Sequence, residues 1–147
     1  IDEYWNNVEA THNSFIDGYW CSGDIAMMDE DGFVYIMDRK KDMINRGGEK
    51  IYSIEVENVL YEHPSILDAA VVGIPDKIFG ERVVAAIVPR ENASINIEEL
   101  ENFLFLRLAP FKVPKEIEIV NELPRNPGGK ILKNVLKERM FKGEMKQ

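Results

Sequence analysis

Two short, uninterrupted apolar runs near the middle of the chain constrain its fold more than any other feature. These runs are LDAAVVGI and RVVAAIV, which are rich in valine and are bounded by Pro75, Gly80 and Pro89. Uninterrupted apolar runs of this length are typical of strands that are buried on both faces. Since no helical pattern separates the two runs, we predict adjacent strands that pair with each other.

Helical patterns lie on both sides of these strands. Ser53 precedes acidic residues and apolar residues spaced three and four apart, and Pro64 stops the pattern, which predicts a helix of about three turns capped by Ser53. A second helix is predicted from a capping residue at Asn96 to the stop at Pro110. EIEIV alternates as a half-buried strand does, and the last helix is predicted to open just after Lys130. This order of elements predicts an α+β fold, with about three helices packed on a small sheet.

The first third of the chain has a different pattern. From Ile1 to Trp20 no period of 2 or 3.6 is sustained, so we predict an irregular segment there. The stretch IAMMDEDGFVYIM predicts a short β-hairpin with its turn near Gly32. The following DRKKDMINRGGEK is rich in basic residues and holds a glycine pair, and we interpret it as a linker or exposed loop.

The composition excludes several classes of protein. No run approaches the roughly 18 apolar residues that a membrane span needs. The formal net charge of -8 disfavours general attraction to nucleic acid or anionic lipid, so any phosphate site must be local. Cys21 is the one cysteine, and with only His12 and His63 beside it the sequence argues against a structural zinc site. A reducing, cytoplasmic setting fits this composition.

The chain opens on IDEYWNN, without a start methionine, a basic segment or an apolar signal region. We therefore expect a fragment that carries no targeting peptide.

Three short stretches hold side chains that could bind a nucleotide. SGD ends in Asp24, whose carboxylate could accept hydrogen bonds from a sugar diol, and DRKKD contains Arg39, whose planar fork could clamp a diol or a phosphate. PRNPGGKILK places Lys130 behind two glycines, where a helix start would add positive potential for an anion. Each stretch also has a purely structural interpretation, as a turn or a solvated charged loop. GGK is not a nucleotide P-loop, because the earlier glycine and the following Ser or Thr are missing.

Taken together, the motifs resemble the C-terminal end of the AMP-forming acyl-CoA and aryl-CoA synthetases, a superfamily that also holds beetle luciferases and peptide-synthetase adenylation domains. The motifs, in order, are YWNN, GYWCSGD, DGFVYIMDRKKDMINRGGEKIYSIEVENVL, HPSILDAAVVGIPDKIFGE and PRNPGGKILK. This resemblance covers almost the whole chain. It implies that residues 1–38 are the tail of a large N-terminal domain and that residues 39–147 form a small, mobile C-terminal domain. The family's phosphate loop and acid pocket are absent from this sequence.

The resemblance implies a ligase that works in two steps. The substrate is expected to be a carboxylic acid with an acyl chain. It first reacts with ATP to give an acyl-AMP and pyrophosphate. The small domain then rotates, and the thiol of CoA attacks the adenylate. ATP, CoA and Mg²⁺ are therefore expected to bind the complete enzyme, with Mg²⁺ not bound by this chain, and the missing N-terminal domain is its expected partner. The chain alone is expected to be inactive.

The family's functional residues can be carried over by position. Lys130 would be the catalytic lysine of the adenylation step. Asp24 would bind the ribose hydroxyls of the nucleotide with the help of Arg39, and Lys41 would stand at the hinge, where some relatives have aspartate. No residue is assigned to a metal.

Gly47 and Gly48 would belong to the loop that faces the active site in the thioester-forming pose and lines the path of the pantetheine arm. GGEKI departs from the Gly-Tyr/Phe-Arg/Gln pattern that is common after this loop, so no CoA contact is assigned to Glu49 or Lys50. Two alternatives to a CoA ligase stay open at this point. One is an adenylation enzyme that delivers acyl groups to a carrier protein's pantetheine, and the other is a non-catalytic interaction module.

Overall fold

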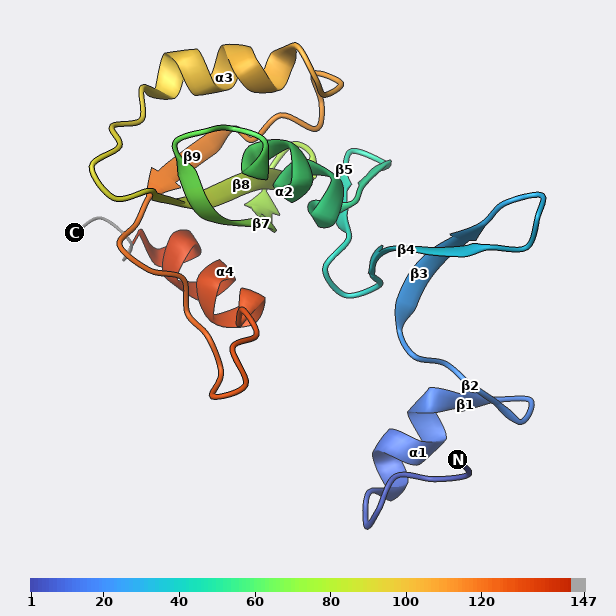
Figure 1. Cartoon of the computed structure of the whole chain (residues 1–147). Coiled ribbons are helices and arrows are strands. Elements are labelled where there is room, and N and C mark those ends of the chain that lie inside the picture. The colour runs from blue at the N-terminus through green and yellow to red at the C-terminus, as the bar shows by residue number, and fades with distance from the viewer. Residues whose placement is uncertain (144–147) are drawn as a thin grey trace. The chain divides into compact units, whose positions relative to one another are not determined.

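A computed structural model describes residues 1–143 of the chain (Figure 1). The chain divides into two compact units, Ile1–Lys41 and Asp42–Gln147, and each unit is described by itself. The assignment of residues 1–38 and 39–147 to two domains of a larger enzyme stays a prediction. Within the described residues, none of the helices combines the length and the apolar character that crossing a bilayer would require.

The first unit contains more regular structure than the sequence predicts. Its elements are α1 (Val8–Ser14), β1 (Phe15–Ile16), β2 (Tyr19–Trp20), β3 (Asp24–Met28) and β4 (Val34–Arg39). The prediction of an irregular segment before residue 21 is wrong, because local hydrogen bonds and turns organise it without apolar periodicity. Asn7 caps α1 by accepting a 2.9 Å hydrogen bond from the backbone of Ala10, and Asp17 and Gly18 turn the chain between β1 and β2 with positive φ.

Strands β3 and β4 confirm the predicted hairpin and its turn. They pair antiparallel, from Met28 opposite Val34 to Asp24 opposite Arg39. Gly32 has a φ of +86°, which glycine adopts without strain, and lies in the turn as expected.

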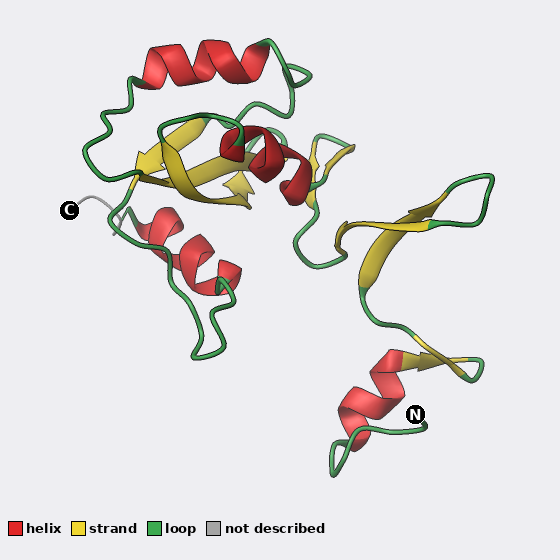
Figure 2. Ribbon diagram, in the orientation of Figure 1, coloured by secondary structure: helices red, strands yellow, loops and turns green. Residues whose placement is uncertain are grey.

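In its described residues, the second unit combines a mixed sheet with three helices, and Figure 2 shows its ribbon. Its elements are β5 (Ile44–Arg46), β6 (Glu49–Ile51), α2 (Ser53–Tyr61), β7 (Ile66–Asp76), β8 (Gly80–Pro89), α3 (Ile97–Phe105), β9 (Glu116–Ile119) and α4 (Lys133–Lys142). Strand β8 pairs antiparallel with β7 along its whole length and parallel with β9, while β5 meets β8 at one end and carries β6 on its other side. The α+β prediction is confirmed, and the two valine-rich runs do pair.

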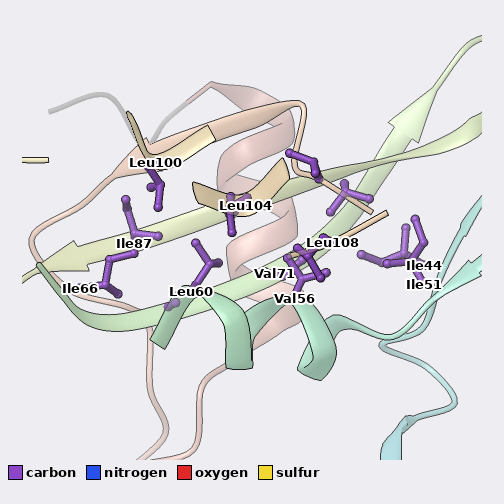
Figure 3. Close-up of a cluster of buried hydrophobic side chains, with 14 residues drawn as sticks. Ile44, Ile51, Val56, Leu60, Ile66, Val71, Ile87, Leu100, Leu104 and Leu108 are labelled. Atoms are coloured by element: carbon purple, nitrogen blue, oxygen red, sulfur yellow. The ribbon is translucent and has the colours of Figure 1, made fainter. Parts of the chain in front are cut away.

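Helices cover both faces of this sheet, which is why residues 69–74 of β7 and 83–88 of β8 are buried and carry no polar side chain. Successive strand residues point to opposite faces, so Val71 packs with α2 and α3 whereas Val72 packs with α4. Figure 3 shows the first of these two cores, and its labelled members are Ile44, Ile51, Val56, Leu60, Ile66, Val71, Ile87, Leu100, Leu104 and Leu108.

The predicted linker after Arg39 is in part a hairpin, which corrects the interpretation as an exposed loop. Strands β5 and β6 pair with Ile44 opposite Ile51, and both of these side chains are fully buried. Gly47 and Gly48 form the turn between them. The two inward isoleucines fix the hairpin to the core, although the residues around them are polar.

Two predicted helix starts need correction, and a third is confirmed. Helix α2 has Tyr52 at its N-cap, and Ser53 is instead its first residue, buried in the core. Helix α4 begins at Lys133 and not directly after Lys130, so Lys130 does not stand at a helix N-terminus. Asn96 caps α3 as predicted, because its side chain accepts hydrogen bonds from two backbone N–H groups of the first turn.

Candidate functional site

Asp24 and Arg39 lie opposite each other at the open end of the β3–β4 hairpin, because the strand register pairs them directly. Arg39 Nε lies 2.9 Å from Asp24 Oδ1, and the two side chains remain 42% and 29% exposed. Among the described residues, this Nε–H finds no acceptor with hydrogen-bond geometry, so the contact is an ion pair by distance alone. A pair this exposed orients the Asp24 carboxylate and contributes at most about 1 kcal/mol to stability.

Backbone contacts hold Arg39 in place beside Asp24. Its Nη2 donates to Ser22 O at 3.3 Å, and its backbone N–H donates to Asp38 Oδ1 at 2.7 Å. Gly23 has a φ of +79°, and its carbonyl accepts a 2.8 Å hydrogen bond from the backbone of Lys40. The SGD and DRKKD stretches therefore meet at one end of the hairpin. A nucleotide site that uses residues of both stretches requires them to be this close.

Lys41 is exposed and is the last residue of the first unit. It lies in the turn between β4 and β5. This location at the division between the units is compatible with the hinge role, which stays a prediction.

Gly47 and Gly48 form a turn that is fixed against the loop between β7 and β8. Gly47 N–H donates to Phe79 O at 2.8 Å, and Gly48 N–H donates to Asn45 Oδ1 at 3.1 Å. Both glycines have positive φ, of +62° and +94°. A Cβ atom on Gly47 would lie 3.2 Å from Phe79 Cδ1, so the turn and the ring are closely packed. The Arg46 guanidinium stacks over the same ring, 4.5 Å from its centroid.

The β7–β8 loop that receives the glycine turn lies within the motif HPSILDAAVVGIPDKIFGE, but none of its residues was predicted to belong to the site. Asp76 Oδ1 accepts hydrogen bonds of 2.9 Å from the backbone N–H groups of Phe79 and Ile78, and these bonds hold the pKa of the Asp76 carboxyl below its usual value. The Ile78 side chain is 83% exposed. The one signal in the sequence was an aspartate followed shortly by a glycine, a common turn pattern.

The segment that carries Lys130 is a closed loop with an ordered backbone. Lys130 N–H donates to Asn126 Oδ1 at 2.8 Å, and Lys130 O accepts from Asn126 N–H at 2.9 Å. Gly129 N–H donates to Asn126 O at 2.9 Å, and Leu132 N–H donates to Pro124 O at 2.7 Å. Lys130 itself is exposed. The glycines therefore form a tight turn that presents the lysine.

Arg125 anchors this loop to strand β7. Its Nη1 donates to Gly129 O and its Nη2 pairs with Asp68 Oδ2. Asp68 also accepts a 2.7 Å hydrogen bond from the Tyr61 hydroxyl. Burial raises the pKa of Tyr61, and the hydrogen bond to Asp68 adds to this.

Lys133, the first residue of α4, anchors the other end of the loop. Its Nζ lies 2.7 Å from Glu57 Oε1 and donates to Ser53 Oγ at 2.6 Å. Neither Arg125 nor Lys133 is among the residues predicted from the sequence. Ser53 and Glu57 are four residues apart on one helix, so their polar groups lie side by side on the same face. Because that face is buried, the spacing could have predicted a polar partner for them.

The predicted site residues are divided between the two units. Asp24, Arg39 and Lys41 belong to the first unit, and Gly47, Gly48 and Lys130 belong to the second. Of these residues, the structure brings Asp24 and Arg39 into contact. Within residues 1–143, no three His, Cys, Asp or Glu side chains gather as they would around a metal ion.

Comparison with known proteins adds to this geometry. Residues 55–130 match the family model described as AMP-binding enzyme C-terminal domain. A long-chain-fatty-acid–CoA ligase of Bacillus subtilis is 49% identical over 135 residues, which are 92% of this chain and 24% of the relative. A fatty acid–[acyl-carrier-protein] ligase of Streptomyces coeruleorubidus is 42% identical over 139 residues, 95% of this chain and 27% of the relative.

A solved structure shows the same likeness. The o-succinylbenzoate CoA synthetase of Bacillus subtilis, in complex with its acyl-adenylate intermediate, superimposes with a TM-score of 0.86 at 38% identity. The match covers 92% of this chain and 28% of that structure. The chain thus spans about a quarter of the length of the relatives that it matches.

Proposed function

Because this chain belongs to the family of AMP-binding enzyme C-terminal domains, we propose that the complete protein is an ATP-dependent, AMP-forming acyl-CoA ligase. The complete enzyme joins a carboxylic acid to ATP, releases pyrophosphate, and transfers the acyl group to CoA. The observation that carries this proposal is Lys130, an exposed cation on a closed and ordered loop, in a chain similar to known ligases over nearly its whole length.

Lys130 acts in the adenylation step. Negative charge develops on the attacking carboxylate and on the α-phosphate, and an ammonium group placed between them stabilises the transition state. The closed loop supports this role because it limits the number of positions that the lysine can take. Removing one such donor slows a reaction by about 10² to 10³.

Asp24 and Arg39 bind the nucleotide. A carboxylate has two oxygens that accept hydrogen bonds, so Asp24 can receive both hydroxyls of a ribose while Arg39 holds it from one side. The ion pair between the two side chains and their partial exposure support this role.

Lys41 and the glycine turn serve the second step. Lys41 is the hinge about which the small domain rotates after adenylation. Rotation replaces the Lys130 loop by the turn of Gly47 and Gly48, which lines the path of the pantetheine arm. Support comes from the small size of this turn and from its attachment to Phe79, since the pantetheine arm with its thiol must pass close to the backbone to reach the adenylate.

The complete enzyme uses ATP and CoA, and its carboxylic acid substrate carries an acyl chain. Mg²⁺ accompanies ATP and neutralises phosphate charge, and no residue of this chain is assigned to it. The enzyme works in the cytoplasm, together with the remainder of its own chain as the partner of these two units.

The test is the complete enzyme with Lys130→Ala. Acid-dependent exchange of pyrophosphate into ATP reports adenylation, and release of thioester from a preformed acyl-adenylate reports the second step. We expect the substitution to slow exchange by about 10² to 10³ and to leave the second step within a few-fold of wild type. Equal loss in both steps would refute the assigned role of Lys130, and a wild-type enzyme without acid-dependent exchange would refute the proposed function.

A carrier protein is the second candidate acceptor, because a carrier-protein ligase is among the relatives. Acyl transfer should be measured with CoA and with a pantetheine-bearing carrier protein at equal concentration. We expect CoA to be the better acceptor, in line with the higher identity to the CoA ligase. Faster transfer to the carrier would favour the second candidate. Tight ATP binding by the 147-residue chain alone would count against a non-catalytic interaction module.

A further inference from the structure

We infer that Arg125 is a positioning residue for Lys130. Its guanidinium ties the peptide group in front of Lys130 to Asp68 on strand β7, so that the lysine is presented in one orientation. That Arg125 orders the loop follows from the contacts of the loop alone. That this ordering speeds adenylation rests on the proposed function.

The peptide group between Gly129 and Lys130 is held at both of its polar atoms. Its oxygen, Gly129 O, accepts a hydrogen bond from Arg125 Nη1, and its nitrogen, Lys130 N, donates to Asn126 Oδ1 at 2.8 Å. A peptide group is planar, so fixing both atoms fixes the direction in which the chain enters Lys130. Gly129 has a φ of +83°, and because a glycine places few steric limits on rotation of that plane, these two bonds add restraint that sterics alone would not supply.

Asp68 is itself held in place and therefore fixes the position of Arg125. Its side chain is only 18% exposed, and Oδ1 accepts hydrogen bonds from the Tyr61 hydroxyl at 2.7 Å and from the backbone of Ala69 at 3.0 Å. Strand β7 is packed on both faces, so this carboxylate belongs to the rigid part of the unit. The connection therefore runs from the core strand through two side chains to the backbone at Lys130.

The chemistry of arginine explains why this residue type is suited to the position. A guanidinium carries five N–H donors in a fixed plane, so it can bind a carboxylate with one edge and a carbonyl with the other. Lysine also has three donors, but they radiate from a single nitrogen on a flexible stem, so lysine lacks the fixed planar fork that reaches both acceptors here. The charge of Arg125 is already offset by Asp68, which indicates a role in holding the loop and not in binding the substrate.

The structural part is tested by amide hydrogen exchange, followed by NMR on the 147-residue chain. We expect Arg125→Ala to speed exchange at the amides of Gly129 and Lys130 by about tenfold or more. Arg125→Lys should recover less than half of the lost protection on a logarithmic scale. Arg139→Ala removes one positive charge from the exposed face of α4 and is the matched control.

Amides of β7 and β8 in the same spectra report whether each variant is folded. Unchanged exchange at Gly129 and Lys130 in a folded Arg125→Ala variant would overturn the inference. Full recovery of protection by Arg125→Lys would overturn the argument from arginine chemistry, because the planar fork would then not be needed.

The catalytic part is tested in the complete enzyme, in the two half-reactions used for Lys130→Ala. Arg125→Ala should slow adenylation by roughly 10- to 100-fold, because displacement of a catalytic group by about 1 Å has an effect of that size. The loss should fall on kcat more than on the KM for ATP, and thioester formation from a preformed adenylate should change less than threefold.

The outcomes separate this inference from the proposed function. If Lys130→Ala abolishes adenylation while Arg125→Ala leaves kcat unchanged, the function stands and the positioning role is wrong. If hydrogen exchange changes as expected but Lys130→Ala does not affect adenylation, Arg125 orders the loop and the proposed role of Lys130 fails. An equal loss in both half-reactions for Arg125→Ala would indicate general damage and would also overturn the inference.

Discussion

Lys133 Nζ lies 2.7 Å from Glu57 Oε1, and this ion pair joins the first residue of α4 to α2, with the two side chains only 16% and 12% exposed. Glu57 Oε1 also accepts a 2.8 Å hydrogen bond from the backbone N–H of Val71, and Lys133 donates to Ser53 Oγ. The pair therefore connects both helical layers through the edge of the sheet, directly after the loop that carries Lys130.

Removing one member of this pair should destabilise the second unit strongly. Lys133→Met leaves the Glu57 carboxylate with little water and one partner fewer, and breaking a buried pair in this way typically costs about 3 to 5 kcal/mol. Urea unfolding of the chain measures the effect. Lys112→Met is the matched control, because Lys112 pairs with Glu55 at 2.6 Å where the side chains are 22% and 38% exposed, and its loss should cost about 1 kcal/mol or less.

The double variant Lys133→Met, Glu57→Gln should recover part of the loss, since it removes the uncompensated charge. If Lys133→Met unfolds at the same urea concentration as the control variant, the pair contributes no more than a surface contact and this account of it is wrong.

The glycine turn should tolerate neither a change of backbone preference nor added bulk at Gly47. Gly47→Ala places a Cβ 3.2 Å from Phe79 Cδ1 at a φ of +62°, and the left-handed conformation costs a non-glycine residue about 1 to 2 kcal/mol. In the complete enzyme we expect slower thioester formation from a preformed adenylate and nearly unchanged adenylation.

Gly47→Asn separates the two causes, because asparagine accepts positive φ more readily than alanine but carries the same Cβ. Recovery with asparagine would assign the effect to the backbone, and no recovery would assign it to the contact with Phe79. A loss confined to adenylation would contradict the assignment of this turn to the second step.

The sequence predicts the centre of the fold because the physical signal there is strong. Short valine-rich runs that are apolar on both faces are typical of a covered sheet, and the centres of β7 and β8 are buried on both faces as expected. The β5–β6 hairpin was not predicted, because each of its three-residue strands carries a single core residue, Ile44 or Ile51, and two polar residues. Two isolated isoleucines have no period, so pattern analysis could not detect them.

The residue types of the candidate site could be predicted from the sequence, but the contacts between those residues could not. Lys130 and its glycines stand out in the sequence, whereas Arg125 and Asp68 are 57 residues apart and Lys133 and Ser53 are 80 residues apart. With 26 acidic residues in the chain, an arginine has many possible partners, and only the packing of β7 against the loop selects one. The helix start was misplaced for a related reason, because the loop closes on Asn126 before α4 can begin.

Asp24 should control affinity for the nucleotide in the complete enzyme. Asp24→Asn keeps the shape of the side chain but removes the charge, and a hydrogen bond to a charged group contributes about 1.5 to 3 kcal/mol. We therefore expect the KM for ATP to rise by roughly 10- to 100-fold, with kcat changed less. Asp31→Asn, in the exposed turn of the same hairpin, is the control. An unchanged KM for ATP would remove Asp24 from the nucleotide site.

Tyr61 should make the stability of the second unit sensitive to alkaline pH. Burial and the hydrogen bond to Asp68 raise the pKa of the Tyr61 hydroxyl above its ordinary value of 10.0. The hydroxyl therefore contributes stability that is fully present below pH about 10, where the unfolded tyrosine keeps its proton, and that is lost as pH rises through the folded pKa. Tyr61→Phe should lower the free energy of unfolding at pH 7 and reduce its fall above pH about 10. Urea unfolding at pH 7 to 11 measures this, with Tyr35→Phe in the other unit as control. An equally steep alkaline fall in Tyr61→Phe and wild type would show that Tyr61 is not the group responsible.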